Sequence, residues 1–132
     1  MNKRIELKYL SVRLHSIQTA LAPEDISKFV EGYNSDSYFS RIRKKIQNEE
    51  NWNSPSQSLF SENDNGSLFF EDWNGNLRLC VPKDQQVEIM SEIHDNLTEA
   101  AHAGYHKIYN RLASIYYWPR MSRHLKKVYW KL

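Results

Sequence analysis

The sequence has little cysteine, little glycine and no long apolar run. Its 132 residues include one cysteine, Cys80, and four glycines. One cysteine excludes a disulfide within the chain, and one thiol is too few for a zinc site of the usual kind with two cysteine ligands. Because no apolar run approaches the roughly 20 residues that span a bilayer, and the start of the chain is too polar for a signal peptide, we expect a soluble intracellular protein, nuclear or cytoplasmic.

Charge is distributed unevenly along the chain, although the formal net charge is only +2. Residues 1–48 carry nine Lys and Arg against five Asp and Glu, residues 49–99 carry two against eleven, and residues 100–132 carry seven against none. A basic segment without acids is typical of a surface that meets phosphate, or of one that meets an acidic neighbour. The acidic middle of the same chain is one such neighbour, so charge pairing within the molecule stays an alternative.

The N-terminal half of the chain is predicted to contain a pair of helices. From Pro23 the apolar residues recur at helical spacing, acids occupy the first turn, and Gly32 is a stop signal. A second helix is predicted to start at Ser35 or Asp36, acting as N-cap, and to run to Ile46.

A small antiparallel hairpin or meander is predicted next. Asn-Gly turn signals at residues 65–66 and 74–75 lie among three short apolar runs. In the last of these runs, residues 77–81, apolar side chains alternate onto one face while Arg78 and Cys80 take the other. This pattern makes Cys80 a strand residue rather than a reactive or ligating group.

The rest of the chain predicts three helices. The first opens at Pro82, the second follows Gly104, and the third opens at Pro119. The apolar faces are predicted to contain Val87, Met90, Ile93 and Leu97, then Ile108, Leu112 and Ile115, then Met121, Leu125, Val128 and Leu132.

The sequence thus predicts an α+β fold that is mainly α and is organised in two parts. Residues 1–81 form the first part, with the helical pair and the hairpin joined by a polar linker at about 48–57. Residues 82–132 form the second part, a three-helix bundle. A chain of this size buries one modest core or two small ones. The pattern of the first 14 residues fits a strand and a helix equally, so the structure of residues 1–20 stays open.

Short motifs between residues 77 and 132 occur in an order that points to a known family. They are Val81-Pro82, His94-Asp95, Ala101-His102-Ala103-Gly104 with Lys107, Arg111-Leu112 and Tyr117-Trp118-Pro119-Arg120-Met121. In this order they resemble the zinc-binding module of integrases from Gypsy-type long-terminal-repeat retrotransposons. Residues 31–42, followed by a hairpin, look more loosely like the extension domain that precedes this module in the same family.

By this resemblance, His94 and His102 are the two histidine ligands of a zinc ion. In the family a Cys-x-x-Cys completes a tetrahedral site that pins the three helices together. Counted from His102 by the family's usual spacing, the first cysteine falls at about residue 132, which is Leu132. The Cys-x-x-Cys is missing, because the gene is truncated or the sequence was cut at that point. Two histidines alone hold zinc weakly, so we expect the sequence to bind zinc weakly, if it binds zinc at all.

Two other candidate ligands are not predicted to hold metal. His106 lies four residues after His102, a helical spacing that puts both rings on one face. The resemblance, however, places His106 at a variable position of the family. Cys80 precedes the helices that carry the histidines and is not expected to replace the missing cysteines.

The resemblance implies a fragment that is not an enzyme. In these integrases the catalytic core follows the zinc module and uses three carboxylates to hold two metal ions. The sequence has no room for that core. The acids between residues 49 and 99 mostly flank turns or lie on predicted exposed helix faces, so no catalytic residue is assigned.

Basic side chains in the last third of the chain are predicted to contact DNA phosphates. Such binding depends little on base sequence and weakens strongly with salt. Tyr117 and Trp118 are instead expected in the core, at the joint between helices. The predicted DNA-binding residues are Lys107, Arg111, Arg120, Arg123, Lys126, Lys127 and Lys131.

The function implied is that of a transposon-derived integrase N-terminal fragment that binds DNA or assists integrase assembly. Self-association and the integrase or reverse transcriptase of the element are further expected partners. The alternative is a domesticated or remnant retroelement fragment that acts as a protein-interaction module. This alternative predicts an exposed apolar patch formed by Leu125, Val128, Trp130 and Leu132. Without the cysteines, residues 100–132 should also be loosely packed, with faster amide exchange than the hairpin.

Overall fold

The computed structural model describes residues 23–48, 59–101 and 104–130. Predictions for residues 1–22, for most of the linker, and for His102, Lys131 and Leu132 lie outside these ranges. The mainly α, α+β fold class is confirmed. In chain order the elements are α2 (Pro23–Gly32), η1 (Tyr33–Ser35), α3 (Ser37–Gln47), β1 (Phe60–Glu62), β2 (Leu68–Glu71), β3 (Leu77–Cys80), α4 (Lys83–Ala101), α5 (Tyr105–Ile115), β4 (Tyr116–Tyr117) and α6 (Met121–Tyr129).

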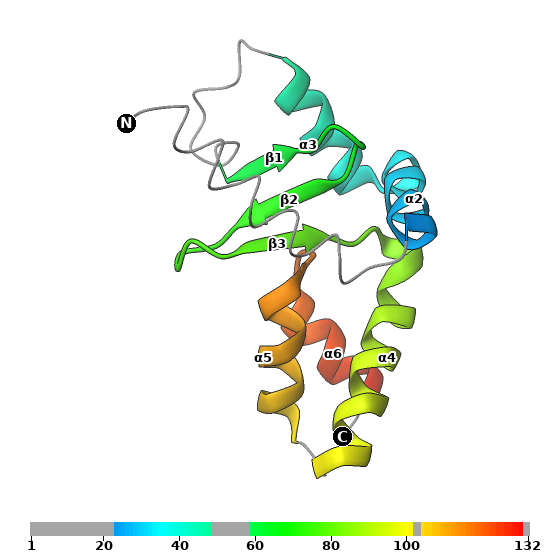
Figure 1. Ribbon diagram of the computed structural model, residues 1–132, viewed down its shortest axis with the longest axis vertical. Helices are drawn as coiled ribbons and strands as arrows, with labels where there is room; N and C mark the ends of the chain where they lie inside the picture. Colours follow the sequence, from blue (N-terminus) through cyan, green and yellow to red (C-terminus); the bar gives the residue numbers. More distant parts are fainter. Residues whose placement is uncertain (1–22, 49–58, 102–103, 131–132) are drawn as a thin grey trace.

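The small sheet lies in the middle of the molecule, with α2 and α3 beside it and α4, α5 and α6 extending away from it (Figure 1). β1, β2 and β3 form the predicted antiparallel meander. Both turns place a glycine at positive φ, Gly66 at 90° and Gly75 at 78°, which is the conformation that an Asn-Gly turn requires. The two turn signals are therefore confirmed.

Helices α2 and α3 confirm the predicted N-terminal pair, and Asp36 connects it to the rest of the chain. One carboxylate oxygen of Asp36 accepts the N–H groups of Tyr38 at 3.0 Å and Phe39 at 3.1 Å, which caps α3. Its other oxygen accepts the N–H of Lys83 at 2.9 Å, at the start of α4. A single, nearly buried carboxylate thus caps the N-termini of two helices.

Strand β4 was not predicted, because the sequence after Pro82 was expected to contain only helices. Tyr116 and Tyr117 pair in parallel with Leu79 and Cys80, which gives the sheet order β1-β2-β3-β4. A strand of two residues is too short to show an alternating pattern. It forms because the chain leaves α5 in extended conformation directly beside β3.

The buried face of α4 also differs from the prediction. Val87 was assigned to the core but is 56% exposed, whereas Ile89, which was not assigned to it, is buried. Met90 is buried as predicted. Gln86 is buried with them and donates from Nε2 to the Val81 carbonyl oxygen at 3.0 Å. This hydrogen bond satisfies a polar side chain inside the core, a possibility that a count of apolar residues does not consider.

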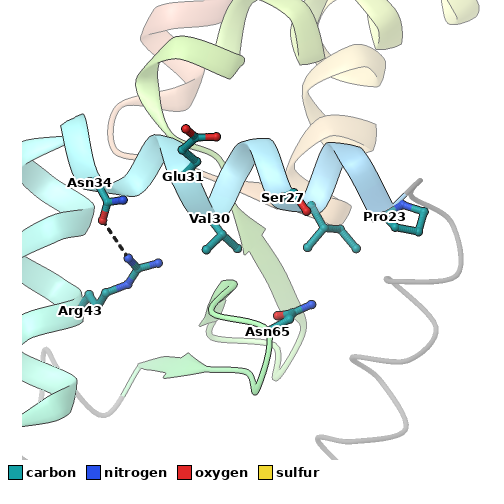
Figure 2. A pocket seen from close by; sticks show the side chains of 8 residues that line it. Pro23, Ser27, Val30, Glu31, Asn34, Arg43 and Asn65 are labelled. Atoms are coloured by element: carbon teal, nitrogen blue, oxygen red, sulfur yellow. Dashed lines mark hydrogen bonds between the residues drawn. The ribbon is translucent and has the colours of Figure 1, made fainter.

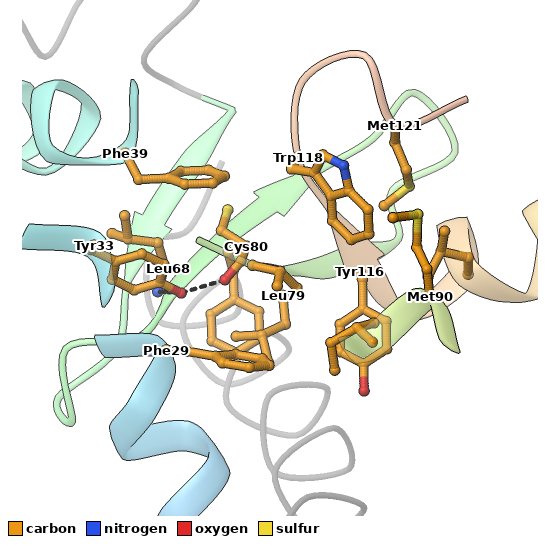
Figure 3. Close-up of a cluster of buried hydrophobic side chains, with 14 of the residues drawn as sticks. Phe29, Tyr33, Phe39, Leu68, Leu79, Cys80, Met90, Tyr116, Trp118 and Met121 are labelled. Carbon is orange, nitrogen blue, oxygen red and sulfur yellow. Dashed lines mark hydrogen bonds between the residues drawn. The ribbon is translucent and has the colours of Figure 1, made fainter. Parts of the chain in front are cut away.

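One continuous core spans both predicted parts of the chain. Figure 3 shows Phe29, Tyr33 and Phe39 on one side of Cys80, and Trp118 and its neighbours from the helical region on the other. The main core side chains of α5 and α6 are Ile108, Leu112, Met121 and Leu125, all buried as predicted. Among the described residues, no helix is long and apolar enough to cross a membrane.

Candidate metal and nucleic-acid site

His94, the first predicted zinc ligand, lies in the second half of α4. Its ring stacks on Tyr129 of α6, with centroids 4.1 Å apart and planes 12° from parallel. Trp130 approaches the same ring edge-on, with a centroid distance of 6.0 Å. The Nδ1 atom of His94 lies 3.3 Å from a carboxylate oxygen of Asp95. Among the described residues, the imidazole thus contacts two aromatic rings and the Asp95 carboxylate.

The described residues do not complete a metal site around this imidazole. Within the described ranges, no three His, Cys, Asp or Glu side chains are grouped so that they could hold a metal ion. His102, the second predicted ligand, lies outside those ranges. His106 is exposed on α5 and contacts the edge of the Tyr105 ring. Of the two predicted ligands, the structure thus describes one, His94.

Cys80 is a strand residue, as the alternating pattern predicted. It is fully buried in β3, beside the α2 and α3 side of the core. Burial raises the pKa of its thiol well above the ordinary value, so the sulfur stays protonated.

The comparison with protein families agrees with the order of the sequence motifs. The family model described as the integrase zinc binding domain matches residues 81–129. This segment is an integrase-type zinc-binding domain. It begins directly after β3 and ends with α6, so the domain contains α4, α5, β4 and α6. No curated protein and no solved structure matches the chain.

The predicted DNA-binding residues lie on two helices of the integrase-type domain and in the turn before the second. Lys107 and Arg111 are four residues apart on α5, and Arg123 and Lys127 are four apart on α6, so each pair shares a helix face. The described members of the set are all exposed: Lys107, Arg111, Arg120, Arg123, Lys126 and Lys127.

These cations have no acidic partner within the described part of the chain. The ion pairs found there are Arg43 with Glu62, at 3.6 Å, and His94 with Asp95, at 3.3 Å. Neither involves a predicted DNA-binding residue. Pairing with the acidic middle of the chain, the alternative left open by the charge distribution, therefore does not occur among the described residues.

Lys126 has an intramolecular contact of another kind. Its Nζ lies 5.0 Å from the centroid of the Tyr105 ring, which places the charge over an aromatic face. This contact joins α6 to the beginning of α5. Lys126 thus has a structural role within the domain, in addition to any contact with phosphate.

Trp118 and His124 form a polar contact inside the integrase-type domain. The indole Nε1–H of Trp118 donates to Nδ1 of His124 at 3.1 Å. An acceptor at Nδ1 requires a neutral ring with its proton on Nε2. Burial and the charge of Lys127 both lower the pKa of His124, which favours this neutral form. Trp118 itself is buried, as predicted, whereas Tyr117 is only half-buried and stacks on Phe70.

The apolar patch expected for a protein-interaction module is not exposed in the described residues. Leu125 is completely buried, and Val128 and Trp130 pack against the core. The expectation of exposure was wrong for Leu125, because the apolar side of α6 faces the core shared with α5 and the sheet. Leu132 lies outside the described residues.

The molecule also has an open cleft of about 600 Å³ outside the integrase-type domain (Figure 2). Ile26 and Val30 of α2 supply its apolar wall, and Arg43 and Asn65 lie opposite them. Arg43 is held in place by hydrogen bonds to the Asn34 side chain and the Gly66 carbonyl. None of the predicted site residues lines this cleft, so it adds nothing to the metal or DNA sites.

Proposed function

We propose that this chain is a non-catalytic integrase fragment of Gypsy-type retrotransposon origin that binds DNA through α5 and α6. The observation that carries the proposal is the row of exposed cations without described acidic partners on these two elements. Unpaired cations attract the phosphate backbone and release its counterions, which provides affinity without base recognition.

The geometry of the two helices supports multivalent contact with a phosphate backbone. Arg123 and Lys127 recur one turn apart on α6, and Lys107 and Arg111 do so on α5. Arg120 lies in the turn just before α6 and adds a further charge. Several cations held by rigid helices lose less side-chain freedom on binding than the same cations on a flexible tail.

Zinc has a secondary place in this proposal. The family is described as zinc-binding, and of the two histidines predicted as ligands the structure describes His94. A bound zinc ion would brace the far end of the three helices, since structural zinc acts by fixing its ligands together. The one cysteine of this sequence, Cys80, is buried in β3, so we infer that it is not a zinc ligand.

The proposal is tested by DNA binding with two charge-matched double variants. Anisotropy of a short labelled duplex would be measured with wild-type protein, with Arg123→Ala/Lys127→Ala, and with Arg41→Ala/Lys44→Ala as control. Arg41 and Lys44 are exposed on α3, so both doubles remove the same charge from different surfaces. We expect the α6 double to weaken binding about tenfold at low salt and the α3 double to weaken it far less.

The salt dependence of DNA affinity distinguishes direct phosphate contacts from attraction by the net charge of the protein. The slope of log K against log salt should become less steep by about 0.9 for every phosphate that the protein no longer neutralises, so by nearly 2 for the α6 double. Equal weakening in the two doubles would show that only net charge matters. No measurable DNA binding by the wild-type chain would contradict the proposal, and self-association in the same samples would favour an assembly role.

A further inference from the structure

The turn between β2 and β3, which projects from one end of the sheet (Figure 1), displays a tryptophan to solvent. Trp73 is fully exposed, so its own chain does not cover it. Leu59 is another exposed large apolar residue at this end of the sheet, where its carbonyl oxygen accepts the Glu71 N–H at 2.8 Å. Glu71 ends β2 and is followed directly by Asp72 and Trp73. We call Leu59, Glu71, Asp72 and Trp73 the turn patch.

Hydrogen bonds within the turn hold Trp73 in a fixed position. One carboxylate oxygen of Asp72 accepts the N–H groups of Asn74 at 3.0 Å and Asn76 at 2.9 Å. Gly75, at a φ of 78°, donates its N–H to the Asp72 carbonyl at 2.9 Å. Because the turn is already ordered, a partner that covers Trp73 does not lose free energy by ordering it. A tryptophan presented in this way has the properties of an interface anchor.

The charge of the turn patch determines which kind of partner fits it. Residues 71–76 contain two acids and no base. Neither Glu71 nor Asp72 forms an ion pair within the described part of the chain. These acids repel phosphate, whereas a Lys or Arg side chain is attracted by the carboxylates and by the face of the tryptophan ring. The turn patch therefore fits a cationic protein surface.

A second copy of this chain carries such a surface on α5 and α6. Its exposed cations form no ion pair with described acids, and residues 104–130 contain no Asp or Glu that would repel the turn patch. The basic helix α3 is less suitable, because Arg43 is already paired with Glu62 at 3.6 Å. The turn patch and the cations of α5 and α6 are thus complementary in charge. The cations of this surface are Lys107, Arg111, Arg123 and Lys127.

We propose that the turn patch of one molecule docks on the cations of α5 and α6 of a second copy of this chain, with Trp73 as the anchor. One tryptophan buries roughly 150 to 250 Å² in such a contact, so the association is weak and reversible. It occupies the same cations as the proposed DNA contact, so DNA and the second copy compete for them. The contact between copies does not depend on DNA binding, because the cations are exposed in either case.

Sedimentation velocity of the full chain, at high protein concentration and low salt, tests the contact. Trp73→Ser removes the anchor, which has no packing role in its own chain. Val87→Ser is the matched control, because Val87 is also exposed but lies on α4, outside both surfaces. We expect Trp73→Ser to weaken self-association at least about tenfold and Val87→Ser to leave it unchanged. A wild-type chain that stays monomeric, or a Trp73→Ser variant that associates like wild type, would overturn the proposal.

The cationic surface is tested with the α6 double variant Arg123→Ala/Lys127→Ala. It should weaken self-association about tenfold, and the α3 control Arg41→Ala/Lys44→Ala should weaken it far less. Mixing Trp73→Ser with the α6 double should restore a complex, because the first variant keeps the cations and the second keeps the turn patch. No complex in that mixture, or wild-type association that does not weaken as salt rises, would show that these surfaces do not meet.

A short DNA duplex separates this inference from the proposed function. We expect excess duplex to dissociate the self-associated species, and Trp73→Ser to bind the duplex at least as tightly as wild type. Self-association that depends on Trp73 and on salt, in a chain that does not bind DNA, would support the inference and contradict the DNA proposal alone. Loss of DNA affinity in Trp73→Ser would assign the tryptophan to DNA and overturn the inference.

Discussion

The two ends of the three-helix unit are held by different kinds of contact. At the sheet end, buried polar groups connect helices to strands through directional hydrogen bonds. Tyr33 donates its hydroxyl to the Cys80 carbonyl at 2.5 Å and accepts the Leu68 N–H at 3.2 Å, and Asp36 caps α3 and α4 together. At the far end, half-buried rings and one cation, that of Lys126, meet through their faces and edges. We call these rings the aromatic clasp; they are His94, Tyr105, Tyr109, Tyr129 and Trp130.

Arg78 illustrates the chemistry of the sheet end. Its Nε donates to the Tyr116 carbonyl at 2.9 Å, and its guanidinium lies over the rings of Phe70 and Tyr117. Burial lowers the pKa of Arg78, yet the carbonyl and the ring faces compensate its charge. The unpredicted strand β4 is thus fixed to β3 by a side chain as well as by backbone pairing.

The difference in contacts between the two ends predicts where substitutions should destabilise the protein most. Removing a partner at the sheet end leaves a buried polar group unsatisfied, which costs more than the hydrogen bond itself. Removing a ring at the far end takes away packing but exposes its neighbours to water. We therefore expect steeper losses of stability at the sheet end than at the clasp, and the following measurements test that order.

The largest effect is expected for Trp118→Ala. Trp118 is 2% exposed, and its removal leaves a cavity beneath β4 and α6. The free energy of unfolding should fall by about 3 to 5 kcal/mol, measured by urea denaturation. Trp118→Phe should be destabilised clearly less, since it retains a ring. A decrease below about 1 kcal/mol in the Ala variant would mean that the two ends do not differ as described.

Substitutions of Asp36 test the double cap. Asp36→Ala removes both caps and should cost about 2 to 3 kcal/mol. Asp36→Asn keeps one carbonyl oxygen for α3 but presents an amide to Lys83 N–H, so it should cost about half as much. Equal destabilisation in the two variants would show that only one of the caps contributes to stability.

Hydrogen exchange should reveal the difference along a single helix. Met90 is completely buried beside the sheet end, whereas Asp95 is exposed next to the clasp. We expect the Met90 amide to exchange at least about tenfold more slowly than the Asp95 amide. The sequence predicted fast amide exchange over all of residues 100–132. Because Leu112 and Leu125 are buried, we now expect fast exchange only for the amides around the aromatic clasp. Equal protection of the amides along α4 would show that the three-helix unit opens as one cooperative unit.

The contact between Trp118 and His124 should make stability depend on pH. Because the pKa of folded His124 is lowered, its contribution is complete above the unfolded value of about 6.5 and declines as the pH falls below it. The melting temperature should therefore drop more between about pH 7.5 and 5.5 in wild type than in His124→Gln, whose amide oxygen accepts the indole N–H at any pH. Superimposable profiles would exclude His124 as the titrating group.

The smallest effect is expected at Trp73. This side chain is fully exposed in the β2–β3 turn, which is held by Asp72 through hydrogen bonds from the N–H groups of Asn74 at 3.0 Å and Asn76 at 2.9 Å. Trp73→Ser should change the free energy of unfolding by less than about 0.5 kcal/mol. It should also remove the tryptophan fluorescence component that is most exposed to solvent among the described tryptophans. A decrease in the free energy of unfolding above about 1 kcal/mol would show that Trp73 makes a stabilising contact, contrary to its full exposure in the structure.

Local patterns were sufficient to predict most elements of this protein. The Asn-Gly pairs determined both turns because glycine alone adopts the required positive φ without strain. Asp36 and Pro23 marked helix starts, and the apolar spacing identified Phe29, Leu112 and Leu125 as core residues, all of which are buried. The order of motifs around His94 and Trp118 identified the integrase-type domain, which the family match at residues 81–129 supports.

Contacts between distant segments were beyond the reach of these patterns. β4 exists because β3 offers it a parallel partner. On α4, Gln86 is buried and donates to the Val81 carbonyl, whereas Val87 is exposed. The contacts of the aromatic clasp were likewise not predictable, because the sequence shows its tyrosines and Trp130 only as aromatic residues within a basic segment. The sequence by itself determined the helices, the three-stranded meander, the charge pattern and the family of residues 81–129, because these depend on neighbours in the chain. The tertiary structure decided how the elements join, since hydrogen bonds and ring contacts between distant residues exist only once the chain has folded.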